Sequence, residues 1–446
     1  MIKILPFLLI ISLMIGCSRY NMQELRTTLE QGNYEGAFAY IDQNTPEDPK
    51  LPFLFERGLV AHYANRFAES GAAFAHAETI AEDLYTKSLL KEGASLFLND
   101  QTRPYAGTQY ERLLAHYYRA LNYVYLNQLE GALVECRRAT ALINYFKDEN
   151  EKYDFFGAAF LAHLSAMLFE ASGEWNNAYI SYRQAAEYYQ NAVEKTGVQI
   201  PVDIGHSIVR LARRLGFADE FERYRDQYGE PPAYPSGTGE LILFYESGYI
   251  PQKGEEALMF PILKTDKPRD EPEKFVPTLL GRAGKVYDDT VLQYVLRVAM
   301  PTIAPNPPHL VGVEVKVGQE QTSSVLVAHI EKIAIETFAA QRTTILFRTV
   351  LRALLKYLAT SEVQKESKIL GIAANIAAVA TERADTRAWE TLPNQIFMVR
   401  MPLSEGTHTL NLSFLDADGR GRGSQSVPDI KIDANRITFL NHRTYE

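Results

Sequence analysis

The spacing of apolar residues divides this chain into two parts. Between residues 22 and 228, apolar residues recur every three or four positions, which is typical of amphipathic helices. After residue 240 they often alternate with polar residues, most regularly at 310–317, and this pattern predicts strands with one buried face. The sequence therefore predicts an all-α part followed by an α+β part, with a mostly antiparallel sheet and a helical insertion.

Four stretches of the helical part share one arrangement of small and large residues: 22–43, 53–80, 109–142 and 155–189. In each, a large residue after a short polar turn is followed three positions later by a small one. These pairs are Tyr34 and Ala37, Phe67 and Ser70, Leu129 and Ala132, and Trp175 and Ala178. Small residues let two antiparallel helices pack closely. The spacing resembles the tetratricopeptide repeat (TPR), a helix–turn–helix unit of ~34 residues, with a plain helical bundle as the alternative.

The array of repeats is expected to end in a polar helix pair at 203–228, and 84–100 is expected to supply a degenerate helix. Such arrays expose a concave groove that holds peptides or helices. Four residues are candidates for lining this groove by their helical phase: Tyr117, Tyr118, Tyr125 and Glu135. Core or convex positions are the alternative for each. Cys136 lies among apolar helix positions, which predicts an inert buried thiol.

The second part is expected to follow an exposed linker, because residues 229–239 are rich in proline and glycine. Each part is expected to have its own core. Strands are expected at 240–246, 256–263, 291–300, 310–317, 395–402, 408–415 and 436–440, and helices at 324–359 and 368–383. The second strand is expected to neighbour the first, and the third to stop at Pro301.

The N-terminus carries a targeting signal. Lys3 is followed by an apolar run at 4–15, which is too short to span a bilayer comfortably. The run ends in LMIGC, which resembles the lipobox of bacterial lipoproteins. That resemblance implies lipidation of Cys17, cleavage between Gly16 and Cys17, and, from Ser18, sorting to the outer membrane. An ordinary signal peptide that ends near a cysteine is the alternative.

The predicted domains are a signal peptide at 1–16, a TPR-like domain at 17–228, a linker at 229–239 and an α+β domain at 240–446. Three motifs occur along this chain: HYYRALNYVYLNQLEGALVECRRA, GELILFYESGYIPQK and ADTRAWETLP. Their order resembles a family of bacterial lipoproteins, of uncharacterised activity, that joins TPR repeats to a β-rich C-terminal domain. The resemblance implies no catalytic residue.

Charge and motifs favour binding over catalysis. The net charge of −9, without a basic block, argues against nucleic acid as a partner. The nine histidines form no metal-ligand motif, so no metal and no cofactor are expected. Asp416 to Gly419 predicts a hairpin turn, with a calcium loop or an anion-binding loop as the alternatives.

The sequence therefore predicts a non-catalytic scaffold that is lipid-anchored to the outer membrane and faces the periplasm. Its repeats are expected to bind an envelope protein or peptide. The alternative is a cell-envelope hydrolase with its active site in 240–446. Titratable groups that converge near His309, His329 or Asp416 would favour that alternative.

Overall fold

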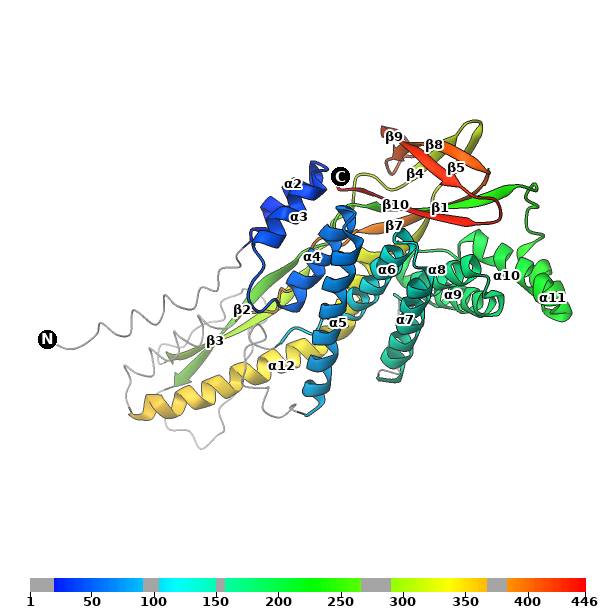
Figure 1. Cartoon of the computed structure of the whole chain (residues 1–446). Coiled ribbons are helices and arrows are strands. Elements are labelled where there is room, and N and C mark those ends of the chain that lie inside the picture. Colours follow the sequence, from blue (N-terminus) through cyan, green and yellow to red (C-terminus); the bar gives the residue numbers. More distant parts are fainter. Residues whose placement is uncertain (1–19, 91–103, 150–156, 266–289, 367–382) are drawn as a thin grey trace.

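The helical part consists of antiparallel helix pairs that stack side by side (Figure 1). The computed structural model describes residues 20–90, 104–149, 157–265, 290–366 and 383–446. The pairs are α2 (Met22–Glu30) with α3 (Tyr34–Gln43), α4 (Leu51–Tyr63) with α5 (Phe67–Leu90), α6 (Gln109–Tyr125) with α7 (Leu129–Glu149), α8 (Ala158–Ser172) with α9 (Trp175–Thr196), and α10 (Val202–Leu215) with α11 (Ala218–Tyr228). Each predicted repeat is one such pair, which confirms the TPR-like fold.

Local sequence sets the ends of these helices. Asn33 caps α3 by accepting a 3.0 Å hydrogen bond from the backbone N–H of Gly36. Gly173 ends α8 in the left-handed conformation, with φ of +79°, which favours glycine. One expectation is wrong here: α5 runs on to Leu90, so 84–90 is not the start of a separate helix. The rest of the predicted helix at 84–100 lies outside the described residues.

The second part contains two four-stranded sheets and a two-stranded ribbon. Its elements are β1 (Thr238–Ser247), β2 (Lys253–Thr265), β3 (Thr290–Ile303), β4 (Val313–Val317), β5 (Glu320–Ser323), β6 (Val325–His329), α12 (Ile330–Glu366), β7 (Gln395–Ser404), β8 (Gly406–Leu415), β9 (Gly421–Ile432) and β10 (Ile437–Thr444). The inner sheet has the order β10-β1-β7-β6, and the outer sheet has the order β5-β4-β8-β9. All pairs are antiparallel except β1 with β10, so the expected α+β part is confirmed.

Several strand expectations need correction. β2 pairs with β3 over their whole length and not with β1. β3 continues past Pro301 to Ile303, because a two-stranded ribbon leaves each strand a free edge that tolerates a missing N–H. The predicted helix at 324–359 begins with strand β6, and α12 starts only at Ile330. The predicted helix at 368–383 lies almost wholly outside the described residues. β5 and β9 were not predicted, because their side chains are mostly polar and exposed.

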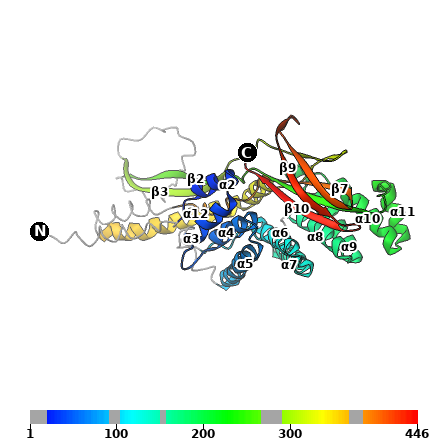
Figure 2. The ribbon, with the colours of Figure 1, turned by 45° about the horizontal axis from the view of Figure 1, so that its top comes forward.

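The inner sheet lies between the helical array and the outer sheet (Figures 1 and 2). Alternation along β1 explains this, because even-numbered residues such as Ile242 and Phe244 join the core shared with the array. Odd-numbered residues such as Leu241 and Leu243 join the core between the two sheets. The continuous apolar run of β1 thus has both faces buried, and the array and the inner sheet share one core.

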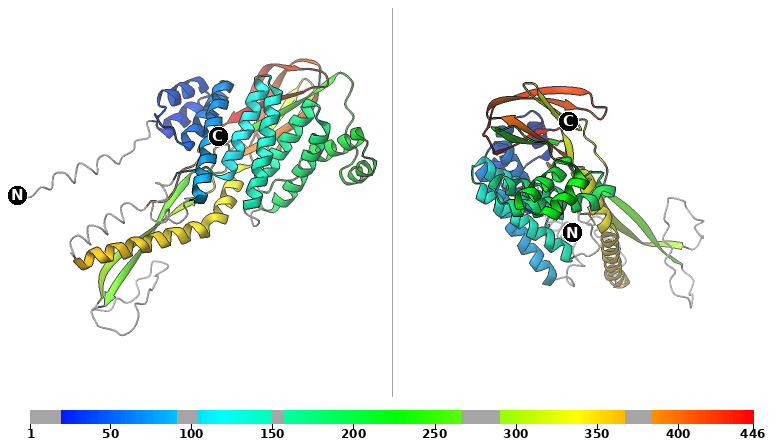
Figure 3. Two further views of the ribbon diagram at one scale, coloured as in Figure 1. Left: turned by 60° about the horizontal axis from the view of Figure 1, so that its bottom comes forward. Right: turned by 90° about the vertical axis from the view of Figure 1, so that its right-hand side faces the viewer.

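Two further features of the fold are the linker and an arm that projects from the body. Residues 232–237 are exposed, as expected for the linker. β2, β3 and α12 project from the body as an arm, on the side opposite α10 and α11 (Figures 1 and 3). None of the helices that the structure describes is long and apolar enough to cross a membrane.

Candidate functional site

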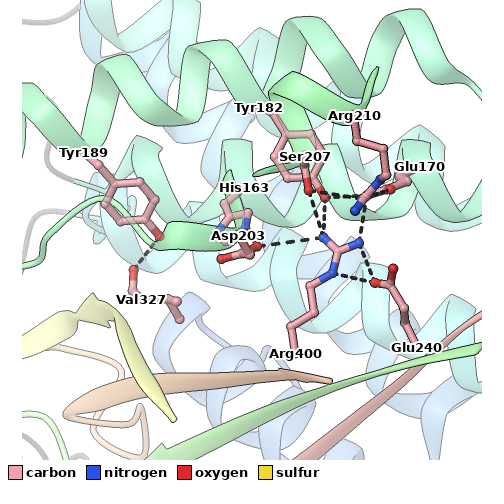
Figure 4. Close-up of polar contacts among 10 residues, drawn as sticks. All are labelled: His163, Glu170, Tyr182, Tyr189, Asp203, Ser207, Arg210, Glu240, Val327 and Arg400. Carbon is pink, nitrogen blue, oxygen red and sulfur yellow. Dashed lines mark hydrogen bonds and ion pairs between the residues drawn. The ribbon is translucent and has the colours of Figure 1, made fainter. Parts of the chain in front are cut away.

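The contact surface between the concave face of the array and the inner sheet holds most of the buried polar groups of interest. Arg400 on β7 is one of them, with 5% of its side chain exposed (Figure 4). Its Nε donates to Glu240 on β1 at 2.5 Å, and its Nη2 donates to Glu170 on α8 at 3.1 Å. Its Nη1 donates to the hydroxyl of Tyr182 on α9 at 2.9 Å. One side chain of the sheet therefore joins two helices of the array.

Further ionisable groups surround this arginine. Arg210 donates to Glu170, and Asp203 on α10 lies 3.8 Å from Nη1 of Arg400. His163 contacts the same Asp203 carboxylate at 2.9 Å. Burial alone would raise the pKa of Glu170, but Arg400 and Arg210 lower that pKa to about 2. Glu170 therefore stays ionised, and the cluster is an internal ion-pair network.

A second buried group lies at the other end of β1. Glu246 is fully buried and accepts hydrogen bonds from the hydroxyl groups of Tyr63 on α4 and Tyr117 on α6, the latter at 2.7 Å. Burial raises the pKa of Glu246, although Arg443 and the two hydroxyls act to lower it. Arg443 on β10 lies over the rings of Tyr63, Tyr249 and Tyr445. Tyrosine side chains of the array thus bind this end of β1.

The segment before β7 lies in the array like a bound peptide. The indole of Trp389 is fully buried and stacks on Phe55 of α4. Its backbone N–H donates to Glu111 on α6 at 2.7 Å, and the N–H of Glu390 donates to Glu56 on α4 at 2.6 Å. Burial raises the pKa of Glu56 to about 8. Two glutamate side chains of the array therefore accept hydrogen bonds from the backbone of this segment.

A polar relay connects the array with β10. The Nδ1–H of His62 donates to Asn122 at 2.6 Å, and its Nε2 accepts from Asn441 on β10 at 3.0 Å. Asn441 in turn accepts from the hydroxyl of Tyr125 at 2.7 Å. Burial lowers the pKa of His62 to about 4, although the hydrogen bonds with Asn122 and Asn441 act to raise it. His62 is therefore neutral at pH 7.

One further cluster lies within the array, away from the sheet. Glu78, His116 and Glu135 bring three potential metal-ligand atoms within 4.8 Å of one another. The two carboxylates contact opposite nitrogens of the His116 ring, at 3.3 and 2.8 Å, so a single ion cannot bind all three groups as they stand. Arg119 already pairs with both carboxylates. His116 has a raised pKa because the contacts with Glu135 and Glu78 outweigh its burial, so the cluster fits an ion-pair network better than a metal site.

The four predicted groove residues lie in three settings. Tyr117 and Tyr118 are fully buried, Tyr117 against Glu246 of the sheet and Tyr118 beside Trp389, with ring centroids 5.9 Å apart. Tyr125 is half-buried and reaches Asn441. Glu135 is buried in the His116 cluster. Their role in partner binding stays a prediction, and in this structure three of the four contact the chain's own second part.

The remaining candidate residues lie in separate parts of the fold or outside the described residues. Gly16 and Cys17 lie outside the described residues. Burial raises the pKa of Cys136 to about 12, as expected for an inert thiol. Gly419 adopts φ of +74° in the turn between β8 and β9, so the predicted hairpin turn is confirmed. Asp416 accepts from the backbone of that turn.

The residues proposed for a hydrolase have separate partners. His329 contacts Gln395, and Asp416 pairs with Arg422. His309 lies on an exposed loop before β4. Among the described residues, no hydrogen bond or ion pair joins any two of these three groups.

Sequence reasoning missed the residues that hold the two parts together. Glu240 and Glu246 flank an apolar strand, and this was the one available signal, since a carboxylate at each end of a buried strand needs partners. Nothing local marks Arg400, Glu170 or Asp203. The three motifs that carry the family resemblance do meet here: α6 with its tyrosines, β1 with Glu246, and the Trp389 segment.

No protein-family model and no curated protein matches this chain, so the lipoprotein resemblance stays an interpretation of its motifs. Solved structures match 46% of it with low similarity. Aspartyl phosphate phosphatase F from Bacillus subtilis matches at 15% identity and a TM-score of 0.31, over 47% of its own length. A putative kinesin light chain with TPR-like repeats, from Podosopora anserina, matches at 15% identity and 0.30, over 90% of its length. The type IV pilus biogenesis factor PilW matches at 19% and 0.22, over 89%. At these TM-scores no function is transferred.

Proposed function

We propose that this chain is a non-catalytic scaffold, anchored by lipid at Cys17 to the periplasmic face of the outer membrane, that binds an envelope protein through its repeats. The observation that carries the proposal is the pairing of buried charges between the array and the inner sheet. Arg400 is shared between Glu240 and Glu170, and Glu246 is held by tyrosines of the array. These groups serve cohesion, because all four are already bonded and Arg400, Glu170 and Glu246 are buried. The lipobox motif supports the proposed location at the outer membrane.

The partner binds the outer surface of the array in this proposal, because the chain's own sheet covers the concave face. The end formed by α9 to α11 offers exposed apolar side chains at Ile180, Val202 and Phe217. Arg214 lies 3.9 Å from the ring centroid of Trp175 at the same end. Arginine and tryptophan are enriched at protein interfaces, and their stacking presents a preformed surface.

Site-specific photo-crosslinking in cells tests this proposal. A photoreactive phenylalanine derivative replaces Ile180, Val202 or Phe217, one at a time, and Gln425 on the exposed strand β9 serves as the control position. We expect the three array positions to crosslink one common envelope protein. Arg214→Ala should lower the yield, whereas position 425 should give no such product. No common product, or an equal yield from position 425, would place partner binding elsewhere.

A further inference from the structure

The side of α12 that faces away from β3 carries an exposed aromatic side chain. Ile345 and Ala353 of α12 pack on Leu296 and Val298 of β3. The opposite side of the helix carries Phe347, which is 68% exposed. Leu351 and Leu354 are half-buried and recur four and seven positions after Phe347, so the three residues lie on one face.

The charge of this helix is opposite to that of the whole chain. Between Glu336 and Glu362, α12 has no acidic residue but carries Arg342, Arg348, Arg352 and Lys356, whereas the chain has a net charge of −9. Arg342 and Arg348 are exposed on the same stretch as Phe347. An apolar face with neighbouring arginines is typical of helices that lie at a membrane surface.

The root of the arm lies beside the first helix of the body. Arg26 of α2 donates to the backbone oxygen of Glu390 at 2.7 Å, and Gln252, directly before β2, donates to the Glu390 carboxylate at 2.9 Å. Tyr20, just before α2, already packs on Phe53. An acylated Cys17 is three residues from Tyr20, a reach of about 10 Å. The anchor would therefore hold the side of the body from which the arm projects close to the bilayer.

We propose that the outer face of α12, with Phe347 at its centre, binds the surface of an anionic bilayer as a second membrane attachment. The proposal rests on the proposed lipid anchor, which selects this end of the molecule. Phe347 enters the boundary between headgroups and acyl chains, while Arg342 and Arg348 reach anionic headgroups. The acyl chains and the arm together then fix the orientation of the array on the membrane.

Vesicle flotation tests this inference on residues 17–446 with Cys17→Ser, which keep every described residue and lack acyl groups. The vesicles contain phosphatidylethanolamine with or without one-quarter phosphatidylglycerol. We expect binding to the anionic vesicles, and about tenfold weaker binding for Phe347→Ser, because burying a phenylalanine contributes at least that factor. Arg342→Gln with Arg348→Gln should weaken binding to anionic vesicles by a similar factor. Val134→Ser is the control, since Val134 is 43% exposed on α7 of the array.

Three outcomes overturn the inference: no vesicle binding, equal binding by Phe347→Ser, or a concentration-dependent dimer that Phe347→Ser abolishes, which would assign this face to a second copy of the chain. The anchor is judged separately, by fatty-acid incorporation at Cys17. A chain that is acylated in cells but does not bind vesicles without acyl groups refutes the arm and leaves the anchor intact. A chain that binds vesicles but is not acylated refutes the lipid anchor and leaves the membrane binding of the arm intact.

Discussion

The indole of Trp389 stacks on the ring of Phe55, with centroids 4.7 Å apart and planes 10° apart. One ring belongs to the segment before β7, and the other belongs to α4 in the second repeat. Their contact lies in the core that the array and the inner sheet share. The concave face of the array, which the sequence assigns to a partner, thus holds a segment of the same chain.

Trp389→Ala should lower the free energy of unfolding by about 3–5 kcal/mol, because it leaves a large cavity in this shared core. The array and the sheet should still unfold in one transition. Urea unfolding followed by circular dichroism measures both. Trp175→Phe is the control, since Trp175 is only half-buried. An unchanged midpoint for Trp389→Ala would show that the segment contributes little.

Arg400→Met should destabilise the chain by about 3–5 kcal/mol, because it leaves Glu240 and Glu170 buried without their shared cation. Adding Glu240→Gln should recover part of the loss, since it removes one unpaired charge. Arg422→Met is the matched control: Arg422, which pairs with Asp416, has 56% of its side chain exposed, so the change should stay within about 1 kcal/mol. Equal effects of both arginine substitutions in thermal unfolding would refute the claim that the ion-pair network stabilises the contact between the array and the sheet.

His62 makes stability depend on pH. Its pKa is about 4 in the folded chain and about 6.5 when unfolded, so between these values the unfolded chain binds the proton more readily. Its contribution is therefore complete above pH 6.5 and is lost as pH falls towards 4, by on the order of 3 kcal/mol. We compare the pH dependence of unfolding for the wild type with that of His62→Gln. The variant should show the shallower slope over this interval, and parallel slopes would contradict the assignment.

The repeats could be predicted from sequence because their signal is local. Within each repeat, the large residue after the turn and the small residue three positions later keep a fixed spacing, and each helix pair packs mainly on its neighbours. The arrangement of the strands could not be predicted in the same way. β1 pairs with β7 and β10, more than 140 residues away, so no local pattern identifies its partners. The candidate site was missed for the same reason, since Arg400 and Glu170 meet only after the sheet has packed on the array.

Cys17→Ser should abolish incorporation of a labelled fatty acid, because the thiol accepts the diacylglyceryl group in the lipobox interpretation. Unprocessed precursor should accumulate, since cleavage between Gly16 and Cys17 follows lipidation. Cys136→Ser is the control, as the Cys136 thiol is buried. Equal labelling of the Cys17→Ser variant would refute the lipid anchor.

The most direct test of the central claim asks whether the array and the sheet form one body once the chain between them is cut. A recognition sequence for a specific protease replaces residues 232–235 in the exposed linker, and the cut chain is then analysed by size-exclusion chromatography. We predict that both pieces elute together at the position of the uncut chain, because Trp389, Arg400 and Glu246 hold the sheet in the array. Two folded pieces that elute separately would show that each part has a sufficient core of its own, and would contradict this account.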